Sequence, residues 1–460
     1  MIGISGAAIY VPRYRIAREV ISAAWGKAPV PGSKAICHFD EDTLTMGYAA
    51  ASRLTRTGAE PDRLVFASTS APYWQRSSAS QIAAACDLRA STGTMDFGGS
   101  LRCGTSALIA AIEAVQAGQV NHVLVTVAER RDAVPESTEE LMFGDAAAAI
   151  AMSREGVLAE VVATHSRSDD FLDEWRRDRD SQVQGYYSKY SLTRGFEANV
   201  GPVVKELLEK AGVPPSEIAL AAIASPDGRS HLTCAKALGI ALHRVVDTCV
   251  AQVGVTGAAM PLMGLALALE AAKPGDLILC AGYGDGADAL LFRSISPGPG
   301  LLRDSKTIDA GTYPLFRKSR DYLLEGSGGA EISNVLWKRE ASQNVRLHGT
   351  RCPVCSRVQF PITRICSACR NTEGLEEVRL GRTGRIFTFT KDFLYDAPVQ
   401  PAIMTVVDLD GGGRFLCQMT DVDEREVRIG MPVELVLRRM REGAANHHYY
   451  WKCRPVEGTA

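Results

Sequence analysis

Apolar and polar residues follow two different periods between residues 98 and 150, and these periods predict a helix and then a strand. Leu108, Ile112 and Val115 lie three or four positions apart, after a segment that contains glycine and serine. This spacing predicts a helix that starts close to residue 103. The run Val123–Val127 is apolar apart from one threonine and predicts a strand. A helix and a strand in this succession favour an α/β fold.

The second half of the chain repeats this order of elements. Gly254–Ala259 opens an apolar helical stretch, Lys273–Asp276 predicts a turn, and Leu277–Cys280 predicts a strand. In the first half, Gly118–Gln119 forms the corresponding turn between the helix and the strand. The sequence therefore predicts an internal duplication of one α/β unit.

Cys103 lies at the predicted mouth of the first duplicated helix, inside the segment Gly98–Ser106. Free amide N–H groups and the helix dipole stabilise an anion there, so we expect a lowered thiol pKa and a nucleophilic sulfur. The same amides are placed to bind the oxyanion of a thioester adduct. The alternative is a buried cysteine that only packs the start of the helix.

Two helix-mouth loops that face each other, with a cysteine on the first, resemble the plan of the thiolase superfamily. Within it, the chain resembles the 3-hydroxy-3-methylglutaryl-CoA synthases through most of residues 1–320. The resemblance implies a duplicated five-layer α/β fold and an acyltransferase that forms carbon-carbon bonds. The cysteine would take an acyl group from acyl-CoA, and a second acyl-CoA would be the carbon nucleophile. The matching segments are Ile2–Gly6, Tyr10–Ile16, Asp40–Met46, Cys103–Ala107, Trp175–Asp178, Pro226–Gly228 and Ala235–Gly239.

Three polar partners that the family pairs with this cysteine are absent. Thr69 occupies the position of the family's glutamate, Ala224 that of its histidine and Val255 that of its asparagine. Because a general acid or base contributes about 10²- to 10⁴-fold to a rate, we expect altered chemistry or none.

Two main interpretations follow from this loss. In the first, Cys103 still carries the acyl group, and the acid–base partners come from the polar residues Thr69, Ser70, Ser225, Asp227 and His231. In the second, the thiolase-like part binds acyl-CoA without catalysis and serves as a scaffold for a thiolase-like or dehydratase partner. A third interpretation, an aldolase that cleaves a CoA ester, does not explain the retained cysteine.

Acyl-CoA as a substrate implies basic contacts for its phosphates. Arg229 and Lys236 flank the turn Pro226–Gly228 and are the candidates, with Gly257 of the second helix-mouth loop as a backbone contact. The resemblance also implies a homodimer. The polar insert at residues 165–198 would then form a wall of the acyl pocket or a dimer contact.

Two Cys-x-x-Cys pairs lie near the start of the C-terminal region. Four thiolates at this spacing can close a tetrahedron around zinc. Because no coordination position is left for water, we expect a structural ion. The predicted ligands are Cys352, Cys355, Cys366 and Cys369.

Short strands separated by glycine turns follow these cysteines. The segments Gly384–Thr390, Ala402–Leu409, Arg414–Met419 and Pro432–Leu437 predict a small closed barrel. Residues 330–458 resemble the zinc-ribbon/OB-fold proteins that accompany thiolase-like enzymes. The role implied is a scaffold, or a cover for the path of the CoA arm. This fused region would replace a separate subunit. An additional enzyme subunit is a further partner that the sequence allows.

Composition restricts the class of protein. With 46% hydrophobic and 23% charged residues, the 460-residue chain has the composition of a soluble globular protein. The 51 basic and 53 acidic residues give no support for nucleic-acid binding. No leader and no apolar stretch of about 20 residues is present, so we expect a cytoplasmic protein without a membrane span. The twelve cysteines are then reduced thiols.

The predicted organisation has four parts. Residues 1–165 form the first thiolase-like half, and residues 166–325 form the second half with the insert. Residues 330–375 hold a helix and the zinc ribbon, and residues 376–460 form the OB-fold barrel.

Overall fold

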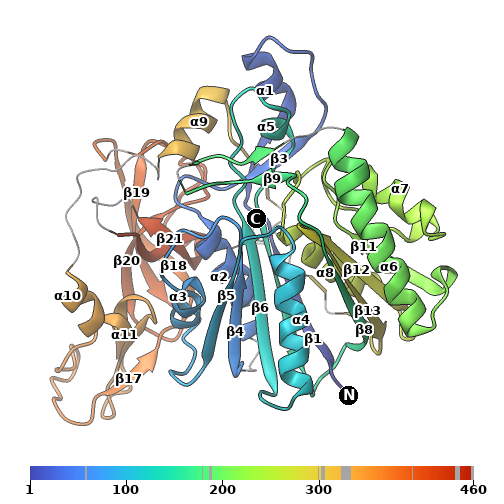
Figure 1. Ribbon diagram of the computed structural model, residues 1–460. Coiled ribbons are helices and arrows are strands. Elements are labelled where there is room, and N and C mark those ends of the chain that lie inside the picture. The colour runs from blue at the N-terminus through green and yellow to red at the C-terminus, as the bar shows by residue number, and fades with distance from the viewer. Residues whose placement is uncertain are drawn as a thin grey trace. The chain divides into compact units, whose positions relative to one another are not determined.

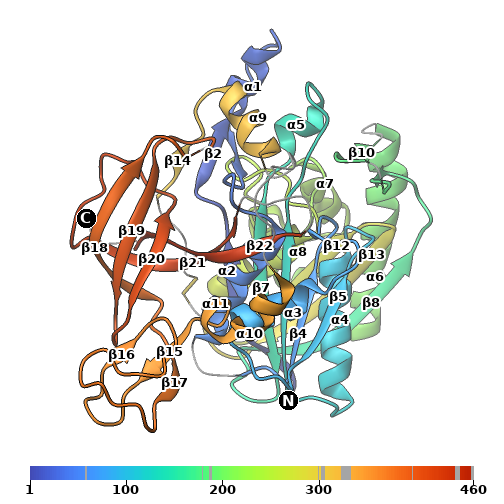
Figure 2. The ribbon, with the colours of Figure 1, turned by 90° about the vertical axis from the view of Figure 1, so that its left-hand side faces the viewer.

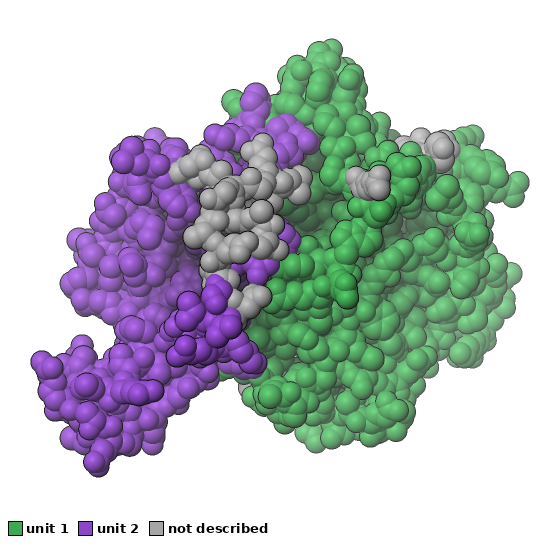
Figure 3. Space-filling model, turned by 60° about the vertical axis from the view of Figure 1, so that its left-hand side comes forward, with its two compact units in different colours: residues 1–37, 42–313 green, residues 38–41, 314–460 purple. Residues whose placement is uncertain are grey.

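The computed structural model describes residues 1–56, 60–178, 180–185, 189–298, 300–301, 306–322, 333–395, 397–440 and 446–456. The chain forms two compact units, which Figure 3 colours green and purple. Unit 1 contains Met1–Cys37 and Asp42–Tyr313, and unit 2 contains His38–Glu41 and Pro314–Ala460. The boundary predicted between residues 325 and 330 lies outside the described residues.

The sheet of unit 1 confirms the internal duplication. Four strands of the first half lie in the order β4-β6-β7-β1, and four strands of the second half lie in the equivalent order β11-β12-β13-β8. In each half the first pair is parallel and the other pairs are antiparallel. The predicted boundary at residue 165 falls inside β8. The bounds are β1 Gly3–Tyr10, β4 Arg63–Ala67, β6 His122–Glu129, β7 Ala146–Ser153, β8 Ala159–Ser168, β11 Ile218–Ile223, β12 Leu277–Tyr283 and β13 Gly286–Ser294.

Four helices complete a five-layer arrangement. Helices α4 (Cys103–Gln116) and α8 (Ala259–Ala271) contact each other and strands of both half-sheets, so they form the middle layer. Figure 1 shows this pair between β6 on one side and β12 on the other. Helix α2 (Thr43–Thr55) covers the outer face of the first half-sheet, and α6 (Ala198–Ala211) covers that of the second. This is the fold that the sequence predicts.

The apolar pattern of each helix explains its layer. Helix α8 carries apolar side chains all around its axis, which suits a helix that is covered on every side. Helix α6 is amphipathic, and its buried apolar residues are Val200, Val203, Val204, Leu207 and Leu208. None of the helices in the described ranges is long and apolar enough to cross a membrane.

Smaller elements surround this framework. The helices are α1 Arg18–Ala24, α3 Ser78–Ala85, α5 Thr138–Met142, α7 Ser230–Ala237, a π-helix at Ser191–Glu197 and 3₁₀ turns at Pro215–Glu217 and Leu242–Arg244. The strands are β5 Gly93–Phe97 at the edge of the large sheet, β2 Tyr14–Ala17, β3 Ser33–Ile36 and β14 Ile308–Asp309 in a small sheet, and the pair β9 Glu174–Trp175 and β10 Gln184–Gly185.

Unit 2 contains a ribbon and a closed barrel. The barrel order is β18-β19-β20-β22-β21, and its interior holds Ile386, Val407, Phe415, Leu435 and Trp451. Figure 2 shows the ribbon at one end of this barrel. The helix α9 at Tyr313–Asp321 begins at the last residue of unit 1. The other bounds are α10 Asn334–Arg339, α11 Ala341–Asn344, β15 His348–Arg351, β16 Val358–Gln359, β17 Glu376–Arg379, β18 Thr383–Asp392, β19 Ala402–Leu409, β20 Arg414–Met419, β21 Pro432–Met440 and β22 His448–Pro455.

Candidate active site

Cys103 is the first residue of α4, as the sequence predicts. Its backbone N–H donates to the carbonyl of Ser100 at 2.9 Å. The start of α4 lies against the second helix-mouth loop: a Cβ on Gly104 would stand 2.7 Å from the carbonyl oxygen of Ala258. Only glycine permits this close approach, and the approach brings the two duplicated loops together.

Asp288, on β13 of the second half, holds the first turn of α4. Its buried carboxylate accepts hydrogen bonds from the hydroxyls of Thr105 at 2.9 Å and Ser106 at 2.8 Å. It also accepts from the Arg102 guanidinium at 3.2 Å. The residues on both sides of Cys103 are therefore fixed by one carboxylate that sequence analysis did not single out.

The thiol of Cys103 does not have the lowered pKa that its place at a helix mouth predicts. Burial raises its pKa well above the ordinary value, and the negative charge of Glu129 adds to this effect. The backbone N–H groups of Gly104 and Cys103 act in the expected direction but do not outweigh burial. The prediction of a lowered pKa is wrong because the sulfur lies in a site that is only 3% exposed.

Glu129 is the second residue that the sequence analysis missed. It ends β6, and its fully buried carboxylate accepts from the backbone N–H of Thr69 at 2.7 Å. The hydroxyls of Thr69 and Ser70 donate to it at 2.9 Å each. Thr69 thus binds a carboxylate at the position where the family's glutamate was expected. The available signal was a charged residue directly after the run Val123–Ala128, which is apolar apart from Thr126.

A cavity of about 360 Å³ lies beside these residues in unit 1. It is formed by the loop after β4 at residues 68–74, the loop before α4 at residues 98–101 and residues 129–131 after β6. The wall also includes Phe171, residues 173–176 and Val183 of the predicted insert, and residues 283–285 at the turn from β12 to β13. Glu129 lines this cavity, and the loop that leads to Cys103 forms part of its wall.

Side-chain contacts hold residues 173–176 of the insert against the cavity wall. Tyr283 donates to Asp173 at 2.9 Å, Arg131 pairs with Glu174, and Arg176 donates to the carbonyl oxygen of Thr69 at 2.7 Å. Arg131 itself is buried against the ring of Phe143, at 4.0 Å from its centroid.

The other two positions where family partners are missing lie together in an apolar cluster. Val255 is buried with Phe143, Val250 and Met260, and Ala224 packs against the same group. This packing leaves no polar side chain at either position. Hydrophobic side chains of the second helix-mouth loop and of the segment after β11 therefore occupy the positions of the family's asparagine and histidine.

Ser225, Asp227 and His231 belong to the turn before α7 and to its start. Asp227 accepts from the backbone N–H groups of Arg229 and Ser230, both at 2.8 Å, and from the Ser230 hydroxyl at 2.7 Å. Ser225 accepts from the N–H of Gly228 at 2.8 Å. Burial lowers the pKa of His231, which favours a neutral imidazole. These contacts explain Ser225 and Asp227 as stabilising groups of the helix start, and neither these two residues nor His231 line the 360 Å³ cavity.

The predicted CoA contacts differ in their surroundings. Arg229 and Lys236 are exposed, whereas Gly257 lies against the buried Arg131. A Cβ on Gly257 would stand 2.5 Å from a guanidinium nitrogen of Arg131, and the positive φ of 53° also favours glycine. Gly257 thus permits the packing of Arg131.

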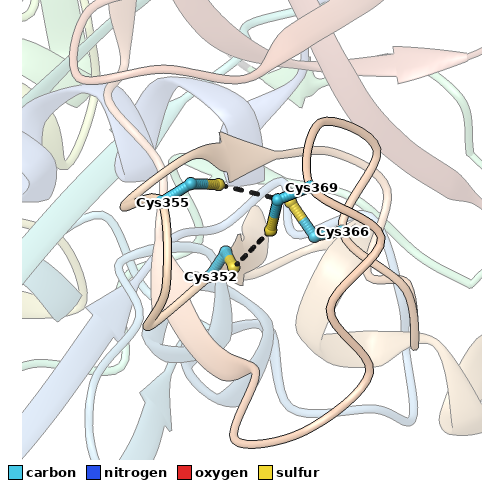
Figure 4. Close-up of side chains that lie close together, drawn as sticks. All are labelled: Cys352, Cys355, Cys366 and Cys369. Carbon is cyan, nitrogen blue, oxygen red and sulfur yellow. Dashed lines mark hydrogen bonds between the residues drawn. The ribbon is translucent and has the colours of Figure 1, made fainter.

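The four cysteines of the ribbon form a candidate metal centre. Their sulfur atoms all lie within 4.8 Å of one another, and Figure 4 shows the side chains converging from two turns. Backbone N–H groups of Cys369 and Ala368 lower the pKa of Cys366 to about 6. Four converging sulfurs with amide donors fit a tetrahedral zinc ion with no open position. The residues are Cys352, Cys355, Cys366 and Cys369.

Comparisons with known proteins divide the chain in the same way. Residues 208–293 match the family model of the 3-oxoacyl-[acyl-carrier-protein] synthase III C-terminal domain. Residues 377–438 match the C-terminal OB-fold domain of ChsH2. Hydroxymethylglutaryl-CoA synthase of Pyrococcus furiosus is 31% identical over 345 residues, which cover 70% of this chain and 97% of the relative. That of Pyrobaculum arsenaticum is 29% identical over 342 residues, or 69% of this chain and 98% of the relative.

Solved structures show the same fold. 3-Oxoacyl-[acyl-carrier-protein] synthase III from Aquifex aeolicus superimposes with a TM-score of 0.58 at 22% identity, over 64% of this chain and 100% of that one. MvaS in complex with 3-hydroxy-3-methylglutaryl coenzyme A has a TM-score of 0.57 at 19% identity, over 64% and 84%.

Proposed function

The chain belongs to the hydroxymethylglutaryl-CoA synthase family, and we propose that it is an acyl-CoA-dependent condensing enzyme that carries its acyl group on Cys103. One observation supports this assignment most directly. Cys103 is the first residue of α4, and it is held there by a carboxylate from the other half of the duplicated fold. The adjoining loop lines a cavity of about 360 Å³, which lies in the ordinary size range of small-molecule sites.

The first chemical step is a thioester exchange. The sulfur of Cys103 attacks the carbonyl carbon of acyl-CoA, and the amides at the start of α4 stabilise the oxyanion that forms. The bond between the carbonyl carbon and the CoA sulfur then breaks, and the thiol proton leaves with CoA. Because one thioester replaces another, the step is close to balanced in free energy.

Zinc in the ribbon would act structurally. With all four ligands cysteine, it cross-links the turns around Cys352 and Cys366 and offers no site for a substrate. The barrel and ribbon together then serve as a scaffold, or cover the CoA arm. We also propose, from the family resemblance, a cytoplasmic homodimer, and light scattering after size-exclusion chromatography measures that state.

A non-catalytic acyl-CoA-binding subunit is the second candidate function. The observation that favours it is the apolar cluster around Val255 and Ala224, where the family places polar catalytic groups. In this case the protein binds an acyl thioester without taking up its acyl group. An additional enzyme subunit would then perform the chemistry.

Mass spectrometry of the intact protein separates the two candidates. We expect acetyl-CoA, propionyl-CoA or acetoacetyl-CoA to leave one acyl group on the peptide that contains Cys103. Cys103→Ser abolishes the adduct. Cys249→Ser is the matched control, because Cys249 is a partly exposed thiol of the same unit and its loss leaves the adduct intact. CoA binding without an adduct from any of the three thioesters contradicts the condensing enzyme and favours the subunit.

A further inference from the structure

We infer that Glu129 is the catalytic carboxylate of this site and that it takes the place of the glutamate which is absent at position 69. The inference rests on the proposed function, because it needs an acyl group on Cys103. It concerns the carbon-carbon step, for which Ala224 and Val255 offer no polar group. Three sets of observations carry it: the hydrogen bonds of Glu129, its position beside Cys103, and the charges that face it.

The hydrogen bonds orient Glu129 without saturating it. The backbone N–H and hydroxyl of Thr69 and the hydroxyl of Ser70 provide three donors at 2.7–2.9 Å. A carboxylate offers about four lone-pair positions, so about one remains to accept a proton. The threonine at position 69 is itself a donor in this arrangement. Where the family has a glutamate at position 69, this chain therefore has a threonine that binds the carboxylate of Glu129 from the neighbouring strand β6.

The position of Glu129 brings it to the nucleophile. Helix α4 packs on β6, and the Val127 side chain stands 3.2 Å from where a Cβ on Gly104 would lie. Glu129 is two residues beyond Val127, at the end of the strand where the cavity opens. Ser100 and Leu101, just before Cys103, line the same cavity as Glu129. An acyl group on the sulfur of Cys103 would thus be formed beside this carboxylate.

The charges around Glu129 suit a base that has to accept a proton. Burial raises its pKa above the ordinary value, against the opposing effect of Arg131 and the three donors. Arg131 also forms an ion pair with Glu174, and this pairing limits how strongly Arg131 stabilises the Glu129 anion. Cys103 faces the carboxylate as a neutral thiol, and as a neutral thioester once acylated. A carboxylate with a raised pKa is a stronger base than an exposed glutamate at neutral pH.

The proposed step balances in atoms and electrons. A C–H bond at the α-carbon of the acyl group on Cys103 breaks, its proton moves to a Glu129 oxygen, and the electron pair forms the enolate. In this step the carbon nucleophile is the acyl group on Cys103, and not the second acyl-CoA that the family resemblance implied. Its enolate carbon forms a bond to the ketone carbon of a second acyl thioester. The ketone oxygen receives the displaced electron pair and then the proton from Glu129. The product is a branched hydroxyacyl thioester still attached to Cys103, which water can release.

Deuterium uptake by the acyl group tests this role directly. The full-length protein is incubated with propionyl-CoA in heavy water, and the mass of the acyl group released from Cys103 is measured over time. We expect the unmodified protein to incorporate deuterium at the α-carbon. Glu129→Gln should still form the adduct, because thioester exchange does not need this base. Its deuterium incorporation should fall about 10²- to 10⁴-fold.

Two further variants keep the test decisive. Glu129→Asp should restore part of the exchange, which a purely structural carboxylate would not do, and it carries the test if Glu129→Gln does not fold. Glu113→Gln is the matched control, since it removes an exposed carboxylate of α4 that does not line the cavity. Exchange at an unchanged rate in Glu129→Gln, or its absence in the unmodified protein, overturns the inference and leaves the proposed function standing. Absence of the adduct in the unmodified protein contradicts the proposed function itself.

Discussion

At the scale of single residues, the nucleophile depends on groups that lie far from it in the chain. Asp288 is 185 positions after Cys103, yet it accepts hydrogen bonds from the side chains of Thr105 and Ser106 in the helix that Cys103 begins. Glu129 comes from a different strand again, and its charge adds to the burial that raises the pKa of the thiol. The chemistry of Cys103 is therefore set by residues of both halves.

Asp288→Asn should weaken the start of α4. The variant removes the charge that is paired with Arg102 and leaves two hydroxyl donors with a poorer acceptor. Loss of one partner from a buried ion pair costs about 3–5 kcal/mol, and we expect a loss of this order in the free energy of unfolding. Chemical denaturation followed by circular dichroism measures it. Asp309→Asn, at an exposed carboxylate, is the control. Equal stability of the two variants would show that Asp288 does not stabilise the start of α4.

At the scale of elements, the sequence patterns predict helices and strands unevenly. The start of α4 agrees with its predicted start, and β19 and β20 agree with the predicted segments. Strand β22 at His448–Pro455 was not predicted. Its buried positions include the charged residues Lys452 and Arg454, which interrupt the apolar pattern expected of a core strand. In the barrel these two cations are paired with Asp40 and Glu434, so their burial depends on partners that are distant in sequence.

The zinc ribbon should depend on its metal, because β15, β16 and β17 are only four, two and four residues long. We expect about one zinc ion per chain by elemental mass spectrometry, and a chelator should make residues 348–379 sensitive to proteolysis. Cys352→Ser should have the same effect without a chelator. Cys249→Ser should retain the zinc. A metal-free ribbon that resists the protease as well as the loaded form would show that zinc is dispensable.

At the scale of the whole molecule, the division into units does not follow the order of the chain. His38–Glu41 belongs to unit 2 although the residues before and after it belong to unit 1. Within unit 2, Arg438 lies 3.2 Å from Glu41 and 2.6 Å from Asp421, and Lys452 lies 2.8 Å from Asp40. These side chains are almost entirely buried. The N-terminal segment therefore supplies two carboxylates to a charge network whose cations come from the barrel.

This network should give the stability of unit 2 a defined dependence on pH. Burial alone would raise the pKa of Asp40, but Lys452, His38 and Arg438 together hold it well below its usual range. A carboxylate with a depressed pKa in the folded state stabilises the fold above its unfolded pKa of about 3.9, and this contribution is lost as the pH falls further. The loss should therefore begin below about pH 4.

Asp40→Asn tests the network. We expect a loss of about 3–5 kcal/mol in the free energy of unfolding at pH 7, since Lys452 loses a buried partner. The difference from the unmodified protein should shrink between pH 4 and pH 2. Fluorescence of the buried Trp451 during denaturation at several pH values reports this difference. A difference that stays constant down to pH 2 would show that Asp40 does not act through its charge.

The sequence by itself determined the features that depend on local patterns. The spacing of apolar residues and the turn residues indicated the duplicated α/β units and the barrel. The spacing of cysteines indicated the metal site, and the motifs around Cys103 indicated the family. These features follow from interactions between residues that are close along the chain, so their signals are local.

Only the tertiary structure decided how the site is completed. Sequence analysis showed that position 69 holds a threonine in place of the family's glutamate, whereas the fold places the carboxylate of Glu129 against this threonine. It expected a lowered pKa for Cys103, whereas burial raises that pKa. Both outcomes depend on which residues the folded sheet brings together and on how much water it excludes. Neither quantity is encoded in any short segment, because each results from the packing of elements that are distant in sequence.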